Sequence, residues 1–436
     1  MSETDTDAAD QFDDRVAAGR LDESRPGLWR RVGRLPRNVL AISLVSLFND
    51  ASSEIIYPFL PLFLTLTLGA SPFAVGLIEG GAESVSALLK LFSGYFSDRR
   101  GRRKGLVVFG YGLAGVMRPL LAFASTWPQV LFIRLADRVG KGVRSAPRDA
   151  LNADSESPAE RGLAFGFHRA MDHAGAVIGP LAGYFILALV AADSSRPTAD
   201  DYRTLFLLAS VPALIAVLVA AFFVRESKRE PRAGGPAAAA PAPLSLRGFD
   251  SNFKRFLVIL ALFTLSNSSD AFLLLRAQQA GVSAAAVPLL WAALHVCKVA
   301  SSLVGGDLSD RLGRKTLIVS GWLLYAAVYT GFAFVSSAAG AWALFLIYGI
   351  YFGLVEGTEK ALVADLVRPE QRGTAYGLYN LAFSVSVFPA SLLMGALWQW
   401  RGPRAAFAVS ALLGSASAAL LALTVRAGHA PRHSRA

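Results

Sequence analysis

About twelve apolar segments follow one another along this chain of 436 residues. Each is close to the ~20 residues that an α-helix needs to cross ~30 Å of hydrocarbon. Only 17% of the residues are charged, whereas soluble proteins carry about 25%. The sequence therefore predicts an all-α polytopic membrane protein.

The basic residues orient these segments in the membrane. The segments run over residues 39–66, 73–96, 106–123, 129–143, 163–190, 205–224, 256–275, 285–304, 317–335, 342–364, 374–398 and 405–425. Loops on the side of the N-terminus hold most of the arginine and lysine clusters, and cytoplasmic loops are enriched in these residues. We therefore expect a multi-pass protein of the inner (plasma) membrane of a prokaryote, with both termini in the cytoplasm.

A charged, low-complexity stretch divides the chain into two halves. RESKREPRAGGPAAAAPAPLSLRGFD separates the sixth and seventh segments, and its Ala/Pro/Gly composition is typical of flexible linkers. The predicted organisation is a cytoplasmic tail at 1–38, a six-helix bundle at 39–224, a cytoplasmic linker at 225–253, a second six-helix bundle at 254–425 and a cytoplasmic tail at 426–436.

Two motifs recur at nearly the same spacing in both halves. GYFSDRRGRRK, which contains Asp98, returns as GDLSDRLGRK, which contains Asp310, 212 positions later. ALNAD, which ends at Asp154, returns as ALVAD, which ends at Asp365, 211 positions later. This agreement predicts an internal duplication. Parallel six-span repeats are typical of secondary transporters, which bind their substrates between the repeats.

The first of these stretches resembles the loop motif between the second and third helices of the major facilitator superfamily. The resemblance extends over essentially residues 39–425, and it implies two six-helix bundles that expose a shared site to each side in turn. The loop-motif residues and the acids expected to face them are Gly94, Asp98, Arg99, Gly101, Arg102, Asp154, Asp310, Arg311, Gly313, Arg314 and Asp365. The resemblance implies that these charges hold the inner gate shut in the outward-facing state.

A glycine pattern in the fifth segment is similar to the fifth-helix motif of proton-coupled antiporters, which implies export. Its residues are Gly166, Gly175, Gly179, Pro180 and Gly183. Tyr184 stands where that motif usually has a second glycine. Glycines at every fourth position leave one helix face without side chains, so that a neighbouring helix can approach closely. The proline tends to kink the helix. Ordinary small-residue packing is the alternative interpretation.

Ionisable side chains lie inside several segments. Each costs at least ~2.5–3.5 kcal/mol in hydrocarbon, so such groups normally face a cavity or a partner. The residues expected along a proton and substrate pathway are Asp50, Glu54, Glu83, Asp137, Arg138, Asp172 and Glu356. A structural salt bridge is the alternative for each of them. The second half carries fewer such charges, which favours proton chemistry in the first bundle and substrate contacts in both.

The fourth segment carries four charged residues on one helix face. They are Arg134, Asp137, Arg138 and Lys141, at positions i, i+3, i+4 and i+7. Arg138 also begins an Arg-x-x-x-Gly pattern that resembles a family motif implicated in proton coupling. Three cations on one face need acids from other helices, and we expect Asp50, Glu54 or Glu83 to supply some of them.

Other membrane charges have simpler expected partners. Arg118 is the lone cation of the third segment, and we expect it to pair with Glu79 or Glu83. In the tenth segment, Glu359 and Lys360 are expected to pair with each other or to lie near the membrane surface.

Enzyme, metal and nucleic-acid functions find no support in the sequence. It has no P-loop, so ATP is not expected to be the direct energy source. Its single cysteine allows no internal disulfide, and its five histidines show no metal-ligand spacing. The net charge of +11 comes from short clusters between apolar segments. We expect no cofactor, no metal and no nucleic acid, and a monomer in the lipid bilayer whose partners are protons and a small-molecule substrate of unknown identity.

The leading prediction is a secondary active transporter that exports a small molecule by proton antiport. Two alternatives within transport are a proton-coupled importer of a small solute and an exporter of a metal or metallophore. A membrane receptor or scaffold that transports nothing is the alternative from another class. A receptor would tolerate loss of the intramembrane carboxylates, whereas an antiporter would not.

Overall fold

The structure is a computed structural model that describes residues 33–100, 103–155, 161–226 and 245–426. Helices account for nearly all of these residues, and no strand occurs among them. Most of both predicted tails and of the linker lie outside the described residues, as do Gly101 and Arg102 of the loop motif. The predicted all-α fold is confirmed for the part of the chain that the structure describes.

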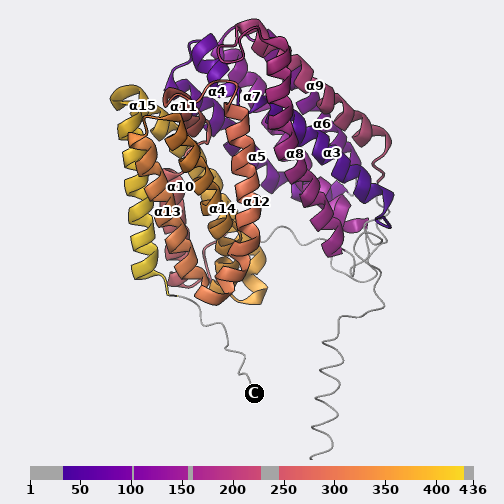
Figure 1. Ribbon diagram of the computed structural model, residues 1–436. Helices are drawn as coiled ribbons and strands as arrows, with labels where there is room; N and C mark the ends of the chain where they lie inside the picture. Colours follow the sequence, from indigo (N-terminus) through magenta and orange to yellow (C-terminus); the bar gives the residue numbers. More distant parts are fainter. Residues whose placement is uncertain (1–32, 101–102, 156–160, 227–244, 427–436) are drawn as a thin grey trace, which may run out of the picture.

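The first half forms a bundle of long helices, seen in indigo to magenta in Figure 1. Its elements are α3 (Arg37–Ile56), α4 (Leu60–Leu62), the π-helix η1 (Phe63–Thr67), α5 (Pro72–Arg100), α6 (Lys104–Leu120), the 3-10 turn η2 (Leu121–Phe123), α7 (Trp127–Asp154), α8 (Arg161–Val190) and α9 (Ala199–Phe222). Because α3, α4 and η1 follow one line, they make a single passage.

The second half forms a bundle beside the first, in orange to yellow (Figure 1). Its elements are α10 (Ser251–Ser266), α11 (Ala271–Gln279), α12 (Val287–Leu312), α13 (Arg314–Phe334), α14 (Ala338–Leu366), the 3-10 turn η3 (Pro369–Gln371) and α15 (Arg372–Thr424). The 53-residue α15 makes two passages and reverses at Gly402. The φ of Gly402 is 82°, a conformation that glycine adopts readily and other residues rarely do. The described residues thus give six passages in each bundle.

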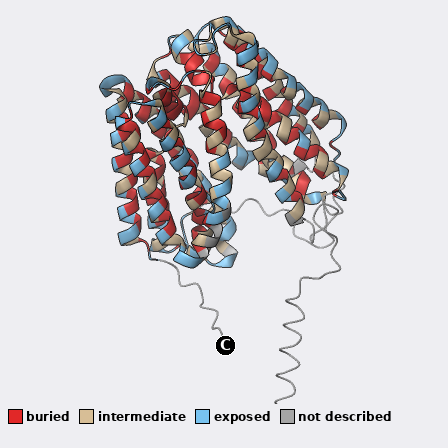
Figure 2. Ribbon diagram, in the orientation of Figure 1, coloured by how far each residue is buried: buried red, intermediate tan, exposed pale blue. Residues whose placement is uncertain are grey.

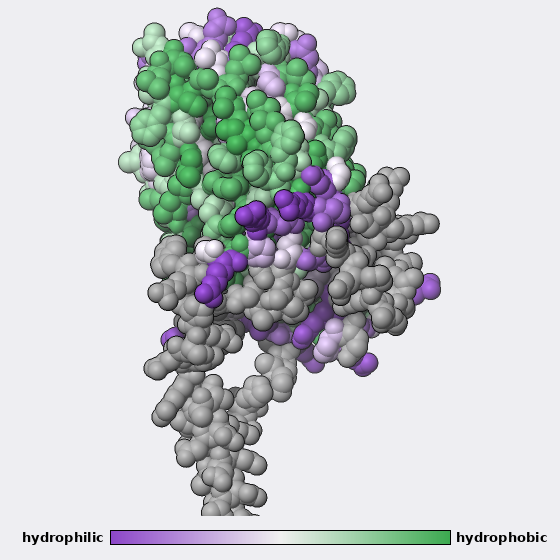
Figure 3. All heavy atoms as spheres, turned by 90° about the vertical axis from the view of Figure 1, so that its right-hand side faces the viewer, coloured by the Kyte–Doolittle hydropathy of each residue, from purple (hydrophilic) through white to green (hydrophobic). Residues whose placement is uncertain are grey.

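Eight of these helices are long and apolar enough to cross a membrane by length and composition. The passages α5 and α7 are not among them because they carry more charge, and in α12 the apolar helix Val287–Ser302 is shorter than the length required. The fourth segment is also longer than the predicted 129–143, because its helix continues through Pro147 to Asp154. Figure 3 shows a broad apolar belt on one face of the molecule, with hydrophilic residues gathered at its two ends.

Two passages are interrupted. The first breaks after Ile56, next to Pro58 and Pro61, since proline removes a backbone donor. The seventh breaks between α10 and α11 at residues 267–270. That break was not predicted, because the stretch Asn-Ser-Ser-Asp contains neither glycine nor proline.

The two bundles are joined at one end of the molecule. We call the end where α3 begins and α9 finishes the tail end, and the opposite end the far end. The largest hydrophobic cluster spans both bundles: in the first it lies toward the far end, around Phe63, and in the second it extends from Trp398 at the far end to Phe253 near the start of α10. Near the tail end, a separate cluster around Ile42 and Val45 lies within the first bundle alone. Figure 2 shows buried residues inside each bundle and where the bundles meet.

Close backbone contact between α5 and α15 makes the seam at the far end. A Cβ atom at Gly76 would lie 2.3 Å from the Ser391 carbonyl oxygen, and one at Gly395 would lie 2.6 Å from the Pro72 carbonyl oxygen. Real Cβ atoms do not come this close, so glycine is required at both positions for the helices to pack as they do. Small residues thus bring the bundles together, as in other membrane helix pairs.

Candidate functional site

The most buried charged pair joins α5 to α7. Glu79 accepts hydrogen bonds from Arg134: Nη2 lies 2.9 Å from Oε1 and 3.0 Å from Oε2, and Nε lies 3.2 Å from Oε1. Both residues are buried. Such bidentate pairing is the strong form of the carboxylate–arginine contact. Glu79 was expected only as a possible partner of Arg118, and its pairing with Arg134 was not predicted.

A second pair lies four residues further along both helices. The Nη2 atom of Arg138 lies 3.2 Å from Oε1 of Glu83. Glu83 is one of the three acids expected to pair with the cations of the fourth segment, so this partnership is confirmed. Its side chain is 45% exposed. Since a charge facing hydrocarbon is costly, an exposed carboxylate within α5 indicates a water-accessible surface beside the pair.

The third pair corrects a prediction. Arg118 was expected to pair with Glu79 or Glu83, but its Nε atom lies 3.4 Å from Oδ1 of Asp137. It also donates to the backbone carbonyl and the side-chain oxygen of Asn49, at 2.9 Å each. The expectation failed because Glu79 and Glu83 are already paired with arginines of α7. Asp137, expected on the pathway, is therefore bound inside the first bundle.

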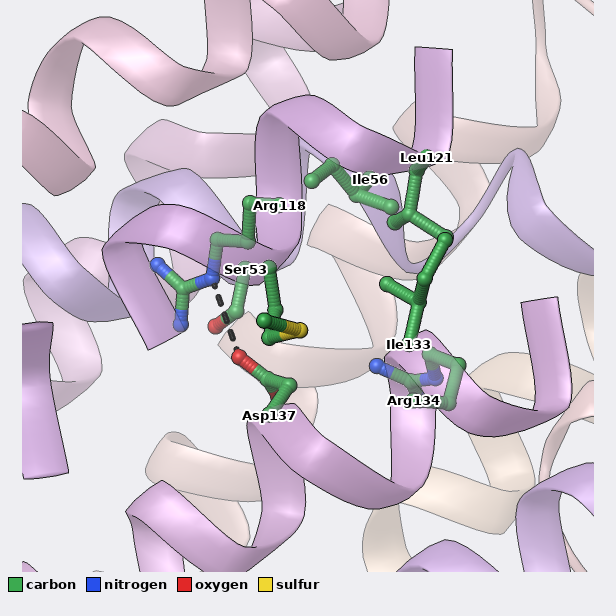
Figure 4. Close-up of a pocket in the computed structure, with 8 residues that line it drawn as sticks. Ser53, Ile56, Arg118, Leu121, Ile133, Arg134 and Asp137 are labelled. Atoms are coloured by element: carbon green, nitrogen blue, oxygen red, sulfur yellow. Dashed lines mark ion pairs between the residues drawn. The ribbon is translucent and has the colours of Figure 1, made fainter. Parts of the chain in front are cut away.

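Figure 4 shows this pair at the edge of a small cavity between α3, α6 and α7. Arg118, Asp137 and Arg134 line it together with apolar side chains such as Ile56 and Leu121. Its volume is about 10 Å³, which is the size of a single water molecule. The cavity is too small for an organic solute.

Two acids of α3 have no ion pair with a described residue. Asp50 accepts a hydrogen bond from Nδ2 of Asn49 at 2.9 Å. Glu54 accepts one from Nε1 of Trp291, at 2.7 Å, and Trp291 belongs to α12 of the second bundle. Lys141 on α7 is within electrostatic range of both acids. Asp50 and Glu54 thus remain close to the cations of α7 without being neutralised by contact.

The remaining pathway candidates form two groups closer to the tail end. On α8, Asp172 lies 3.7 Å from both His168 and Arg169. In the second bundle, Glu356 of α14 lies 3.6 Å from Nζ of Lys298 on α12. Both groups are within their own bundle.

Glu359 departs from its expected role. It was expected to pair with Lys360 or to lie near the membrane surface, but it is buried at 7% exposure. It accepts hydrogen bonds from Nε1 of Trp322 at 3.0 Å and from the hydroxyl of Tyr379 at 2.8 Å. Lys360 is exposed on the other side of α14. Sequence reasoning missed this site because neutral aromatic donors, rather than a cation, stabilise the acid.

The loop motifs are described in part. Arg103 pairs with Asp154 in the first bundle, and Arg314 lies 2.8 Å from Asp365 in the second. The structure therefore brings the acid of each ALxAD element to a motif arginine of its own bundle. The side chains of Asp98, Arg99 and Asp310 lie outside the described parts of the chain.

Two glycines and one arginine complete these motifs. Gly94 lies inside α5 and is 3.4 Å, measured from its ideal Cβ position, from the Ala146 side chain. Gly313 has φ 87° at the turn between α12 and α13, a conformation that favours glycine. Arg311 is exposed in the last turn of α12.

The glycine face of α8 packs against α3. A Cβ atom at Gly175 would lie 2.7 Å from the Leu47 carbonyl oxygen, and one at Gly179 would lie 2.6 Å from that of Ala51. Gly183 continues this face, and Pro180 lies within the helix. Gly166 does not share in it, since nothing lies within 4 Å of its Cβ position. The motif therefore fixes how closely these two helices approach, next to Asp50 and Glu54.

Among the described residues, no group of three or more histidine, cysteine or acidic side chains could hold a metal ion. What the arrangement offers is a row of ion pairs across α5 and α7, with unpaired acids on the adjacent α3. Such buried charges mark ion and substrate pathways in membrane proteins.

A family comparison agrees with this architecture. The model of the Major Facilitator Superfamily matches residues 42–391 and 277–436. The chain belongs to that superfamily. The predicted fold class and the general assignment to membrane transport are thereby confirmed.

Individual relatives agree with the family. An uncharacterised MFS-type transporter of Methanocaldococcus jannaschii is 34% identical over 402 residues, which cover 89% of this chain and 94% of that protein. The multidrug resistance protein MdtG of Dickeya zeae is 26% identical over 73% of this chain and 75% of its own. The crystal structure of a D-xylose–proton symporter superposes with a TM-score of 0.71 at 18% identity, covering 90% of this chain and 98% of that one. That last similarity concerns the fold alone.

Proposed function

We propose that this transporter exports a small molecule in exchange for protons. The observation that carries the proposal is the ion-pair row of α5 and α7, which ends at the half-exposed pair of Glu83 and Arg138. Beside it, Asp50 and Glu54 form no ion pair with a described residue. A proton-coupled carrier needs a carboxylate that can change its partner, and these acids offer one.

The proposed cycle uses competition for arginine. Protonation of Glu83 removes the charge that holds Arg138, so the guanidinium turns to Asp50 or Glu54 on α3. Release of the proton restores the pair with Glu83. A substrate bound to Asp50 or Glu54 is displaced when Arg138 pairs with that acid. Asp172 and Glu356, each paired within its own bundle, are proposed to line the path toward the tail end.

Export, orientation and assembly are also proposals. The glycine pattern of α8 resembles that of antiporters, and a relative at 26% identity is named a multidrug resistance protein. We propose that the tail end faces the cytoplasm of a prokaryote, because the basic loops gather there. The far-end seam would then close the outer side. We propose that the protein works as a monomer in the lipid bilayer.

Proton flux in everted membrane vesicles tests the proposal. Addition of a transported solute should release protons from the vesicle lumen in the wild type, across a panel of cationic, anionic and metal-chelate solutes. Asp50→Asn, Glu54→Gln, Asp137→Asn and Arg138→Gln should each be tested alone, with Asp200→Asn on the exposed start of α9 as the matched control. Coupled transport should be lost in at least one of the four and retained in the control.

Three results would overturn the proposal. Coupled transport that survives all four neutralisations would exclude these residues as the coupling site. A proton that moves in the same direction as the solute would indicate an importer. No response to a broad panel, with folded protein present, would favour the receptor or scaffold class.

A further inference from the structure

The break in the seventh passage places a carboxylate between two half-helices. Helix α10 ends at Ser266, α11 begins at Ala271, and Asp270 precedes the first turn of α11. Discontinuous helices of this kind supply ion and substrate sites in secondary transporters. Irregular backbone at membrane depth is tolerated where it lies inside protein or lines a cavity. Neither the ion-pair row nor the proposed proton cycle uses Asp270.

One tyrosine hydroxyl serves two side-chain oxygen acceptors at this break. The hydroxyl of Tyr348 lies 2.9 Å from Oδ1 of Asp270 and 3.5 Å from Oδ1 of Asn267. A tyrosine has one proton to donate, so it cannot satisfy both oxygens fully. A carboxylate alone offers about four acceptor sites, and Asp270 forms no ion pair with a described residue. The break thus has oxygen atoms to spare for a positive ligand.

Two buried hydroxyl groups strengthen this point. Ser268, within the break, is 6% exposed, and Tyr329 is fully buried. The Tyr329 hydroxyl lies close to those of Ser268, Tyr325 and Tyr348, and it interacts electrostatically with Asp270. Neither hydroxyl oxygen makes a hydrogen bond with a described residue. Unpaired buried hydroxyls are uncommon, since leaving them so costs about 1–3 kcal/mol, and their lone pairs can coordinate a cation.

The charged groups around the break leave it negative. Lys298 is the cation that acts on Asp270, and Glu83 of the first bundle adds a second negative charge. Lys298 is already engaged, because its Nζ lies 3.6 Å from Glu356 and 3.9 Å from the centre of the Phe352 ring. The site therefore keeps an acid that no described cation neutralises by contact.

We propose that the α10–α11 break binds a small monovalent cation, either Na⁺ or the ammonium group of a substrate. Asp270 supplies the charge, and the side-chain oxygens of Asn267 and Ser268 supply further ligands. Tyr348 and Tyr329 enclose the site, with their ring centroids 6.1 Å apart. The site does not depend on proton exchange or on the direction of transport.

Thermal unfolding of the purified full-length protein tests the site without any ion gradient. A ligand that binds only the folded state raises its stability. Samples at equal ionic strength contain NaCl, methylammonium chloride, KCl or choline chloride. We expect Tm to rise in NaCl or in methylammonium chloride relative to choline chloride. A rise in NaCl identifies sodium as the ligand, and a rise in methylammonium alone identifies a substrate ammonium group.

Three variants locate the effect. Asp270→Asn should weaken binding by at least about tenfold, because it removes a charged ligand. Ser268→Ala should weaken binding less than Asp270→Asn does, and its Tm in choline chloride should equal that of the wild type. It therefore tests the site even if Asp270→Asn does not fold. Asp200→Asn, an exposed aspartate of α9, should bind as the wild type does.

Two outcomes would overturn the inference. Equal Tm in all four salts for the wild type would show that no cation binds. A salt effect that appears only in Lys298→Gln would show that Lys298 itself occupies the break. Because binding is measured without transport, failure of proton-driven export in vesicles would leave a positive result intact.

Discussion

At the scale of single residues, the two ion pairs between α5 and α7 differ in burial. Glu79 is 2% exposed, whereas the side chain of Glu83 is 45% exposed. Breaking a buried pair leaves an uncompensated charge and costs about 3–5 kcal/mol. The pair of Arg138 and Glu83 has one buried and one half-exposed partner, so we expect it to contribute less, toward the roughly 0–1 kcal/mol of surface pairs. We therefore predict that Glu79→Gln lowers the free energy of unfolding far more than Glu83→Gln, as measured by SDS titration in mixed micelles. Equal losses would contradict this account.

Sequence reasoning reached these residues but not all of their partners. The spacing of Arg134, Asp137 and Arg138 fixes a common helix face, and this predicts that acids lie opposite. It does not fix the rotation of α5 or α6, so the pairs of Arg118 and of Arg134 could not be assigned. Glu359 was missed for a different reason, since its partners are neutral aromatic donors far away in the sequence.

At the scale of helices, the contact between α8 and α3 depends on glycine. We predict that Gly179→Leu prevents normal packing, because even its Cβ atom would lie 2.6 Å from a backbone oxygen. Gly166→Leu is the matched control in the same helix, since its Cβ position is open. Yield of folded monomer on size exclusion should fall for the first and not for the second. A well-folded Gly179→Leu protein would refute this packing argument.

The number and order of passages could be predicted because hydrophobic length and basic loops encode them directly. The interruption between α10 and α11 could not, because residues 267–270 contain polar side chains but no glycine or proline. The continuation of α7 from residue 143 to Asp154 was not predicted for a related reason. Hydropathy reports contact with lipid, and the polar end of α7 is a helix with little such contact.

At the scale of the whole molecule, the α5–α15 seam sets the balance between closed and open far ends. We predict that Gly76→Ala opens this end, because the added Cβ would lie 2.3 Å from the Ser391 carbonyl oxygen. Gly81→Ala is the control, since its nearest contact is an ordinary 3.5 Å. Spin labels at Asp193→Cys and Ser336→Cys in a cysteine-free chain should report longer distances in the first variant alone. Unchanged distances would show that the seam does not hold the bundles.

The loop motifs lie at the opposite end of the same molecule. We predict that Asp98→Asn slows turnover while substrate affinity stays largely intact, as expected of a gate residue. Asp365→Asn should behave alike, because it frees Arg314, now 2.8 Å away. Exchange rates in proteoliposomes, compared with equilibrium binding to purified protein, separate the two quantities. Parallel loss of binding would place these residues at the substrate instead.

The hydrogen bond from Trp291 to Glu54 crosses from one bundle to the other, and Tyr57 lies with its ring centre 5.0 Å from that of Trp291. An indole whose N–H is bound to a carboxylate emits differently from one that faces water or lipid. A variant that retains Trp291 as its single tryptophan should therefore change its fluorescence each time the two bundles separate at the far end. Trp291 would thus serve as an intrinsic fluorescence reporter of the transport cycle, with no attached dye.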